Sequence, residues 1–299
     1  MTENNTKEKN SFITVLEVLK KAIVDLDKNN IIDARLNAEL LLCNVMNCKR
    51  LDLYVNYEKP VKPSEENEFR KLILRRISNE PIQYILGKTN FFGYDITLDR
   101  NVLIPRQETE LLVERVLEDI SSSEKKSVSI FEIGTGSGCI VIALSKRLSE
   151  LNILYELFSI DISEKALITA KKNLELNGIS GENITLYCKD VFDIPKLKKK
   201  YDYIVSNPPY ISMNNYQALP EEIRNYEPKN ALTDDKNGLN FFNKIFEIFS
   251  DSEFSGKMFC EIGYGQKESL EVLLKKYEIM KYKFYKDYSN IFRILKAEK

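Results

Sequence analysis

The spacing of apolar residues along the chain changes twice, and each change marks a different kind of secondary structure. Over the first part of the chain, apolar side chains recur every three to four positions, which is typical of amphipathic helices. The spacing predicts one helix over residues 12–26, a second that follows Asp33 and runs to Met46, and a third that begins at Ser64. Asp33 is the expected N-cap of the second helix, because its carboxylate can accept hydrogen bonds from free N–H groups of the first turn. Residues 1–85 are therefore predicted to form a small helical domain.

Apolar and polar residues then alternate, which is the pattern of β-strands. The alternation covers residues 86–107 and is interrupted at Gly93 and at a polar turn over residues 99–101. It predicts a β-hairpin that links the helical domain to the rest of the chain. An amphipathic helix is expected from Glu108 to about Ile120.

Strand and helix patterns alternate through the remaining domain, residues 108–299. Short apolar runs predict strands at Val128–Ile133, Leu154–Ile160, Ile184–Cys188, Tyr203–Ser206, Met258–Ile262, Tyr282–Tyr285 and Ile291–Leu295. One helix follows the first strand, and another is capped by Ser163 and ends at Asn177-Gly178. This alternation is typical of an α/β fold with a doubly wound, mostly parallel sheet. Ligands of such folds bind outside the carboxyl ends of the strands, so site residues are expected there.

The composition narrows the chemistry that the chain can perform. Its 299 residues include no histidine, which removes the commonest general base and the commonest zinc ligand, and we expect no metal site. A formal net charge of −1 provides no overall attraction for nucleic acid. The five cysteines form no CxxC pair and are expected to be buried free thiols in a reducing compartment. The polar N-terminus lacks the signal-peptide pattern and no apolar run is long enough to span a membrane, so we expect a cytoplasmic protein.

Five small residues after the first strand are suited to binding a nucleoside cofactor. They are Gly134, Thr135, Gly136, Ser137 and Gly138. A glycine turn between a strand and a helix lets the backbone approach a ligand closely and presents N–H groups to it. Asp161 ends the next strand, where a carboxylate can accept hydrogen bonds from ribose hydroxyls. Taken singly, the loop could be only a tight turn and Asp161 only a cap residue, but their spacing favours a shared ligand.

A third segment, Asp190-Val191-Phe192, follows the strand at Ile184–Cys188. Asp190 could accept a hydrogen bond from the amino group of an adenine ring, and Val191 or Phe192 could cover the face of that ring. This pattern is weak by itself and gains meaning only beside the glycine turn.

The reaction site is predicted at Asn207-Pro208-Pro209-Tyr210, which directly follows the strand at Tyr203–Ser206. Two consecutive prolines end a strand because they lack N–H groups and fix φ near about −65°. The turn therefore offers carbonyl groups, the Asn207 side-chain amide and the aromatic wall of Tyr210. A planar –NH2 group could donate its two hydrogens to Asn207 Oδ1 and to a proline carbonyl. An isolated match of four residues is more often an ordinary loop, so the interpretation depends on the other segments.

Taken together, these segments resemble a known family. The glycine turn, the two aspartates and the Asn-Pro-Pro-Tyr turn are similar, in this order, to class I S-adenosylmethionine-dependent methyltransferases that act on exocyclic or amide nitrogen. Residues 81–87, 91–93 and 103–110 further resemble the release factor glutamine methyltransferase family, often called PrmC or HemK. The resemblance covers nearly the whole chain. The sequence departs from the family pattern at Gln107, where proline is more common, and at Val191, where some members carry an aromatic residue.

The resemblance implies a Rossmann-like enzyme that methylates N5 of the glutamine in the Gly-Gly-Gln motif of class 1 peptide chain release factors. It assigns S-adenosylmethionine to residues 134–138, Asp161, Asp190, Val191 and Asn207, and the reaction to residues 207–210. It also implies that the helical domain recognises the protein substrate. The chemistry agrees, because hydrogen bonds to both N–H groups of an amide would orient its nitrogen toward the methyl group and stabilise the developing positive charge. No strong base is required, so the lack of histidine is no objection.

Three other interpretations remain open from the sequence. A sister activity methylates a glutamine of a large-subunit ribosomal protein through the same kind of pocket. An adenine-N6 DNA methyltransferase uses an equivalent turn on a flipped base, although the near-neutral charge and the lack of a basic insertion count against it. A non-catalytic protein that binds the cofactor and docks on a partner is disfavoured by the intact turn at residues 207–210.

Overall fold

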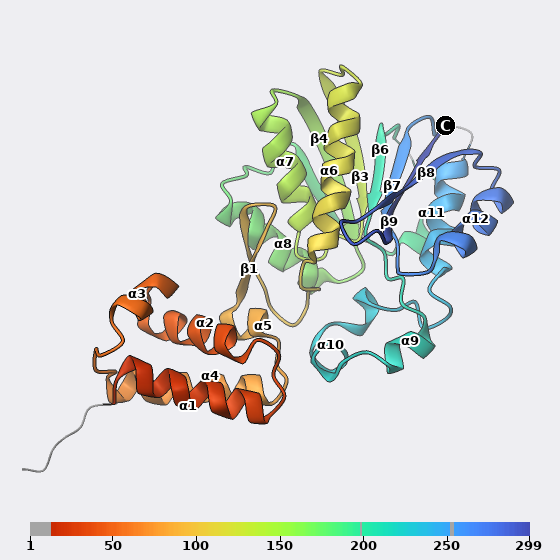
Figure 1. The fold of residues 1–299 in the computed structure, drawn as a ribbon. Helices are drawn as coiled ribbons and strands as arrows, with labels where there is room; N and C mark the ends of the chain where they lie inside the picture. Colours follow the sequence, from red (N-terminus) through yellow and green to blue (C-terminus); the bar gives the residue numbers. More distant parts are fainter. Residues whose placement is uncertain (1–12, 198, 252–253) are drawn as a thin grey trace, which may run out of the picture. The chain divides into compact units, whose positions relative to one another are not determined.

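The chain divides into two compact units, which Figure 1 shows in ribbon form. The computed structural model describes residues 13–197, 199–251 and 254–299. One unit ends at Leu86, and the other comprises Gly87–Lys299. The first unit is helical and the second contains the sheets.

The first unit contains two short helices beyond the three that the sequence predicts. Its helices are α1 (Val15–Lys28), α2 (Ala34–Met46), α3 (Arg50–Val55), α4 (Pro63–Ile77) and α5 (Ile82–Leu86). Asp33 precedes α2 as expected, but its backbone is left-handed (φ 54°) and its side chain makes no capping hydrogen bond. The third predicted helix is α4, which begins at Pro63, one residue earlier than predicted. Proline fits this first position because its missing N–H has no helical partner there.

The predicted hairpin is present but shorter than the alternation suggested. Strands β1 (Lys88–Phe91) and β2 (Tyr94–Thr97) pair antiparallel around Phe92 and Gly93. The apolar residues after β2 are buried without belonging to a strand, and they are Leu98, Val102 and Ile104. A turn ends the pairing here, because Asp99 accepts hydrogen bonds from the N–H groups of Asn101 and Val102. The hairpin belongs to the second unit, where Asn173 exchanges hydrogen bonds with the backbone of Thr97.

The second unit is built on a seven-stranded sheet with the order β5-β4-β3-β6-β7-β9-β8. The strands are β3 (Ser127–Ile133), β4 (Leu154–Asp161), β5 (Ile184–Cys188), β6 (Tyr203–Ser206), β7 (Lys257–Glu261), β8 (Lys281–Lys286) and β9 (Phe292–Glu298). The first five in the spatial order are parallel, and β9 pairs antiparallel with both β7 and β8. This arrangement confirms the predicted doubly wound, mostly parallel sheet.

Helices follow the strands as the alternation predicts. They are α6 (Gln107–Ser122), α7 (Cys139–Glu150), α8 (Glu164–Leu176), α9 (Met213–Gln217), α10 (Glu221–Tyr226), α11 (Asn240–Ser250) and α12 (Lys267–Lys276), with short 3-10 turns at Val191–Asp193 and Lys229–Ala231. Ser163 caps α8 as predicted, since its hydroxyl accepts a hydrogen bond from the N–H of Ala166. The sequence interpretation did not identify α9 to α12. Of these, α11 places Phe242, Phe246 and Phe249 in the buried core.

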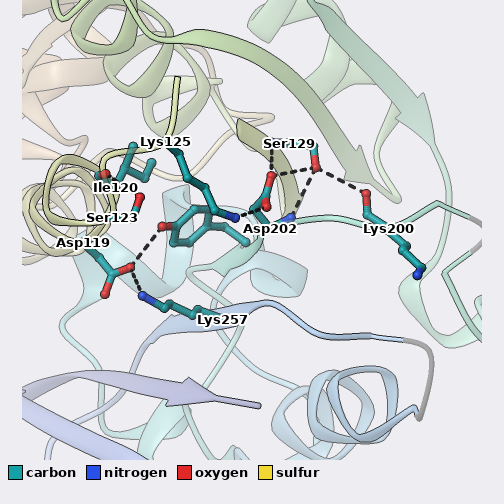
Figure 2. Close-up of polar contacts among 9 residues, drawn as sticks. Asp119, Ile120, Ser123, Lys125, Ser129, Lys200, Asp202 and Lys257 are labelled. Atoms are coloured by element: carbon teal, nitrogen blue, oxygen red, sulfur yellow. Dashed lines mark hydrogen bonds and ion pairs between the residues drawn. The ribbon is translucent and has the colours of Figure 1, made fainter. Parts of the chain in front are cut away.

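Polar contacts fix the beginning of β6, as Figure 2 shows. Asp202 accepts a hydrogen bond of 2.7 Å from the N–H of Ser129 and forms an ion pair with Lys125. Asp119 of α6 accepts hydrogen bonds from the Tyr203 hydroxyl (3.0 Å) and from Lys257 (2.6 Å). These contacts hold β6 between β3 and β7, so the residues after Ser206 leave the sheet at its carboxyl edge.

The cysteines are all free thiols, but not all are buried as predicted. Cys43 and Cys260 are buried, whereas Cys188 at the end of the edge strand β5 is exposed. Within the described ranges, no helix has the length and apolar character needed to cross a bilayer. No group of three or more potential metal-binding side chains occurs among the same residues.

Candidate active site

The predicted site residues meet at the carboxyl ends of β3, β4, β5 and β6. They surround a cavity of about 320 Å³, which falls within the size range of small-molecule sites. Its lining includes residues 134–137, Asp161, residues 190–192 and residues 207–209. Two predicted residues lie outside this lining, Gly138 and Tyr210.

Gly138 has a packing role at the start of α7. Its φ is +80°, which L residues adopt only with strain, and a side chain there would lie 3.1 Å from the Cβ of Ala170. Gly138 therefore allows the start of α7 to approach α8. Gly138 lies outside the cavity lining, and its contact with the cofactor stays a prediction.

The glycine turn presents fewer N–H groups to the cavity than the sequence suggested. The N–H groups of Gly134 and Thr135 both donate to the carbonyl of Ile160, at 2.9 and 3.0 Å. The N–H of Gly136 donates to Asp161 Oδ2 at 2.8 Å. These hydrogen bonds hold the turn against the end of β4. The turn thus contributes mainly a backbone surface that a ligand can approach closely. Gly136 has no side chain, and the space where its Cβ would lie is open.

Asp161 links the glycine turn to α8 and keeps capacity for a ligand. Its Oδ2 accepts the hydrogen bond from Gly136, and its Oδ1 accepts one of 2.8 Å from the N–H of Ser163. An ionised carboxylate can accept about four hydrogen bonds, so two remain for a diol such as ribose. Burial raises the pKa of Asp161, although the backbone hydrogen bonds act in the opposite direction.

A buried polar chain lies beneath the glycine turn, and sequence reasoning missed it. Thr135 Oγ1 and Ser159 Oγ are 2.6 Å apart, and Ser159 in turn donates to Glu132 Oε2. Glu132 is completely buried in β3, and this burial raises its pKa to about 8. A carboxyl group within the apolar run before the glycines was the available signal. Ser137 Oγ is buried too, and it has no hydrogen-bond partner among the described residues.

The opposite wall of the cavity is apolar and aromatic. Val191 is buried, and Phe192 packs edge-on against Phe241 of α11 with ring centroids 5.1 Å apart. Asp190 Oδ1 accepts a hydrogen bond of 2.9 Å from the N–H of Phe192, which stabilises the turn. All four residues line the cavity, and Phe241 was not predicted. The free acceptor sites of Asp161, the unpartnered buried hydroxyl of Ser137 and the aromatic wall together fit a nucleoside with a polar arm.

The Asn-Pro-Pro-Tyr turn is held beside the glycine turn. A Cβ at Gly134 would lie 3.7 Å from the carbonyl oxygen of Asn207, so the two segments are in near contact. Asn207 Nδ2 donates a hydrogen bond of 3.0 Å to Thr109 Oγ1. Within the part of the chain that the structure describes, neither Asn207 Oδ1 nor the Pro208 carbonyl accepts a hydrogen bond. Both acceptors are therefore available to a ligand.

Tyr210 is fixed by the segment that follows β7. Its hydroxyl donates to Glu261 Oε1 at 3.0 Å, and its carbonyl accepts from Gln266 Nε2 at 2.9 Å. A side chain at Gly263 would lie 2.9 Å from the Tyr210 ring, so this glycine is needed for the close packing. Glu261 is 1% exposed, and burial raises its pKa to about 7. Sequence reasoning missed these contacts because Glu261 and Gln266 lie more than 50 residues beyond the turn.

A second, smaller cavity of about 130 Å³ adjoins the first. Asn207, Pro208 and Arg106 line both cavities, and Tyr210 lines only the second. Apolar side chains form most of the remaining wall: Leu103, Ile211, Leu219, Ile223, Ala231 and Leu232. Arg106 forms an ion pair of 2.5 Å with Glu227, which connects the segment before α6 to the loop after α10.

Comparisons with known proteins identify the family. Residues 17–87 match the PrmC N-terminal domain, and residues 124–260 match a methyltransferase domain family. The release factor glutamine methyltransferase of Fusobacterium nucleatum is 35% identical over 95% of this chain and 78% of its own length. That of Buchnera aphidicola is 36% identical over 94% of this chain and 98% of its own length. The chain belongs to the release factor glutamine methyltransferase family. It is therefore an S-adenosylmethionine-dependent methyltransferase.

Solved structures agree on the fold of this family member. The catalytic domain of hMettl16 is 17% identical, with a TM-score of 0.53, over 79% of this chain and 81% of that one. A 16S rRNA methyltransferase of T. thermophilus is 16% identical, with a TM-score of 0.51, over 71% of this chain and 49% of that one. At these identities the similarity shows the class I methyltransferase fold alone.

Proposed function

We propose that the chain transfers a methyl group from S-adenosylmethionine to N5 of the glutamine in the Gly-Gly-Gln motif of a class 1 peptide chain release factor. The observation that carries the proposal is that Asn207 and Pro208 line both cavities, one suited to a nucleoside and the other to a side chain. A methyl donor and an acceptor amide would therefore meet at this turn. The names of the relatives supply the class of acceptor.

In this proposal, different residues of the larger cavity bind different parts of the cofactor. Asp161 accepts hydrogen bonds from the ribose hydroxyls with its two remaining acceptor sites. Asp190 receives the adenine amino group, while Val191, Phe192 and Phe241 enclose the ring. The backbone of residues 134–137 and the Ser137 hydroxyl face the polar arm. The bound cofactor supplies a methyl group on a sulfonium, and the sulfur leaves as a neutral thioether.

The turn prepares a weak nucleophile for this transfer. An amide nitrogen reacts poorly because its lone pair is delocalised into the carbonyl group. Asn207 Oδ1 and the Pro208 carbonyl each accept one of its N–H groups, which points the nitrogen at the methyl carbon and stabilises the positive charge that develops. With the cofactor bound, the nitrogen lone pair would form the new N–C bond as the C–S bond breaks, and the nitrogen would then lose one proton to water. Tyr210 and Pro209 form the wall beside the reacting group.

The test is a methyl-transfer assay with labelled cofactor on four acceptors. These are a class 1 release factor, its form with Gln replaced by Ala in the Gly-Gly-Gln motif, a large-subunit ribosomal protein and duplex DNA. Label on the release factor alone, and none on its Ala form, supports the proposal. Label on the ribosomal protein with none on the release factor would move the activity to the sister substrate, and label on DNA would overturn a protein acceptor.

The same proposal gives the helical domain, residues 1–85, a part in binding the release factor, with the hairpin at 86–107 as the linker and the catalytic domain at 108–299. The lining of the larger cavity supports it, since every lining residue lies beyond residue 100. On α3, Leu51 and Val55 lie one turn apart and are 72% and 77% exposed. Replacing both with glutamate should raise KM for the release factor and leave cofactor affinity unchanged. An unchanged KM would remove this face from the docking surface.

A further inference from the structure

Three side chains from distant segments form one hydrogen-bonded chain behind the Asn-Pro-Pro-Tyr turn at residues 207–210, which we call the reaction turn. Asn207 Nδ2 donates to Thr109 Oγ1 at 3.0 Å, and Thr109 Oγ1 donates to Glu261 Oε2 at 2.6 Å. Thr109 lies in the first turn of α6, and Glu261 is the last residue of β7. Thr109 and Glu261 are 2% and 1% exposed, so water does not compete for these contacts. The proposed function gives neither Thr109 nor Glu261 a role.

The chemistry of the three groups fixes the direction of every hydrogen bond in this chain. An ionised carboxylate only accepts, so the single hydroxyl hydrogen of Thr109 is committed to Glu261. Thr109 Oγ1 can then only accept from Asn207, and the group of Asn207 that donates is its –NH2. Asn207 Oδ1 must therefore face the opposite way. The other oxygen of Glu261 accepts from the Tyr210 hydroxyl at 3.0 Å, so one carboxylate holds both ends of the turn.

We propose that Thr109 and Glu261 are positioning residues that determine which end of the Asn207 amide faces the methyl acceptor. This inference rests on the proposed function and deepens it. An Asn207 amide rotated by half a turn would present its –NH2 group to the –NH2 group of the incoming glutamine, and two donors cannot bond to each other. We call the hydrogen-bonded chain of Asn207, Thr109 and Glu261 the relay. It prevents this rotation before the substrate arrives. The acceptor oxygen is thereby preorganised, and its alignment costs nothing at the moment of transfer.

The relay depends on the charge state of Glu261. The charged and titratable groups that act on it are Tyr210 of the turn, Glu108 of α6, Arg293 of β9 and Cys139 at the start of α7. Burial and Glu108 raise the pKa of Glu261, whereas the hydrogen bonds from Thr109 and Tyr210 and the charge of Arg293 lower it, with a result of about 7. A protonated Glu261 has a hydrogen to donate, so the direction of the chain is no longer fixed below that pH.

The decisive comparison is between Thr109→Val, which removes the hydroxyl at constant shape, and Thr109→Ser, which keeps it. Single-turnover transfer to the release factor at saturating cofactor should fall roughly 5- to 150-fold in Thr109→Val, the range for removing one partner of a buried hydrogen bond. Thr109→Ser should stay within about fourfold of the wild type, because it loses only one methyl group. Cofactor affinity and KM for the release factor should change little in both. Equal losses in the two variants, or a parallel loss of cofactor affinity, would overturn the inference and indicate a packing role.

Two further measurements separate this inference from the proposed function. The wild-type rate should decline as pH falls through about 7, and Glu261→Gln, which cannot titrate, should lose that decline; parallel pH profiles would contradict the relay. The second measurement needs no acceptor: by NMR, the Asn207 side-chain –NH2 protons should exchange with water slowly in the wild type and in Thr109→Ser, and rapidly in Thr109→Val. If the wild type fails to methylate the release factor, the proposed function fails, and this exchange experiment still decides the relay.

Discussion

The glycine turn at residues 134–138 and the reaction turn at residues 207–210 lie side by side, yet they are stabilised in different ways. The glycine turn is held by backbone hydrogen bonds to Ile160 and by Asp161, both from the next strand along the chain. The reaction turn is held by side chains that come from segments about 100 residues before it and about 50 residues after it. Thr109 contacts its first residue, and Glu261 and Gln266 contact its last.

This difference separates binding from reaction. The contacts of the glycine turn come from one β-α-β unit, so the part of the cofactor surface that this turn forms does not depend on α6 or β7. The reaction turn is correctly built only when α6, β6 and the end of β7 have assembled. Substitutions behind the glycine turn should therefore alter cofactor affinity, whereas substitutions behind the reaction turn should alter turnover.

Asn207→Ala should have the largest effect on turnover. Absence of this effect would contradict the contrast between the two turns. Loss of Oδ1 removes one preorganised acceptor of the substrate amide, so turnover should fall about 10²- to 10³-fold. Cofactor affinity should change much less, because the variant leaves the glycine turn intact. The measurement is single-turnover transfer to a release factor at saturating cofactor, with affinity by calorimetry. Near-normal turnover would mean that the methyl acceptor is held elsewhere.

Asp161→Ala should have the complementary effect on the cofactor side. Removal of the carboxylate leaves the Gly136 N–H without its partner and removes the proposed ribose contact, so affinity should weaken by about 1 to 3 kcal/mol. Turnover at saturating cofactor should be affected less than affinity. Calorimetry that shows wild-type affinity would refute the ribose role.

Tyr210→Phe tests the contrast more finely, because it removes only the hydrogen bond from the Tyr210 hydroxyl to Glu261. Glu261 Oε1 then loses its donor in a buried site, so the free energy of unfolding should decrease by about 1 to 3 kcal/mol at neutral pH. Turnover should fall less than in Tyr210→Ala, because the ring wall is retained. Urea denaturation and single-turnover rates measure the two effects. A greater loss of turnover in Tyr210→Phe than in Tyr210→Ala would be incompatible with this role of the ring.

The last prediction concerns the pH dependence of stability, because each turn has one buried carboxyl group beneath it. Burial raises the pKa of Glu132 to about 8 and that of Glu261 to about 7. Both lie above the value of about 4.3 for an unfolded glutamate, so the native state binds more protons between these limits and stability falls as pH rises through them. Urea denaturation from pH 5 to 8 should show a shallower decline in Glu132→Gln and in Glu261→Gln than in the wild type. Superimposable curves would show that neither carboxyl is perturbed.

The elements that the sequence predicted well are those with a strong local pattern. The strands at Ile184–Cys188 and Tyr203–Ser206 were placed at the residues where the structure has them, because a short apolar run bounded by polar turns has few alternatives. The family resemblance was also confirmed by the relatives. The hairpin was overextended, since Leu98, Val102 and Ile104 are buried by packing and not by strand pairing. Alternation alone cannot distinguish these two causes of burial.

Sequence alone determined the parallel sheet, the glycine turn, Asp161 and the Asn-Pro-Pro-Tyr turn, because each depends on residues that are close together along the chain. Only the tertiary structure decided what lies behind them. Nothing in the sequence links Thr109, Glu261 or Gln266 to the reaction turn, and the sheet order that places β7 beside β6 brings Glu261 and Gln266 to it. Hydrogen bonds act over about 3 Å in space and take no account of separation along the chain. The sequence therefore singled out Asn207 as a candidate site residue, and only the structure gave the orientation of its side-chain amide.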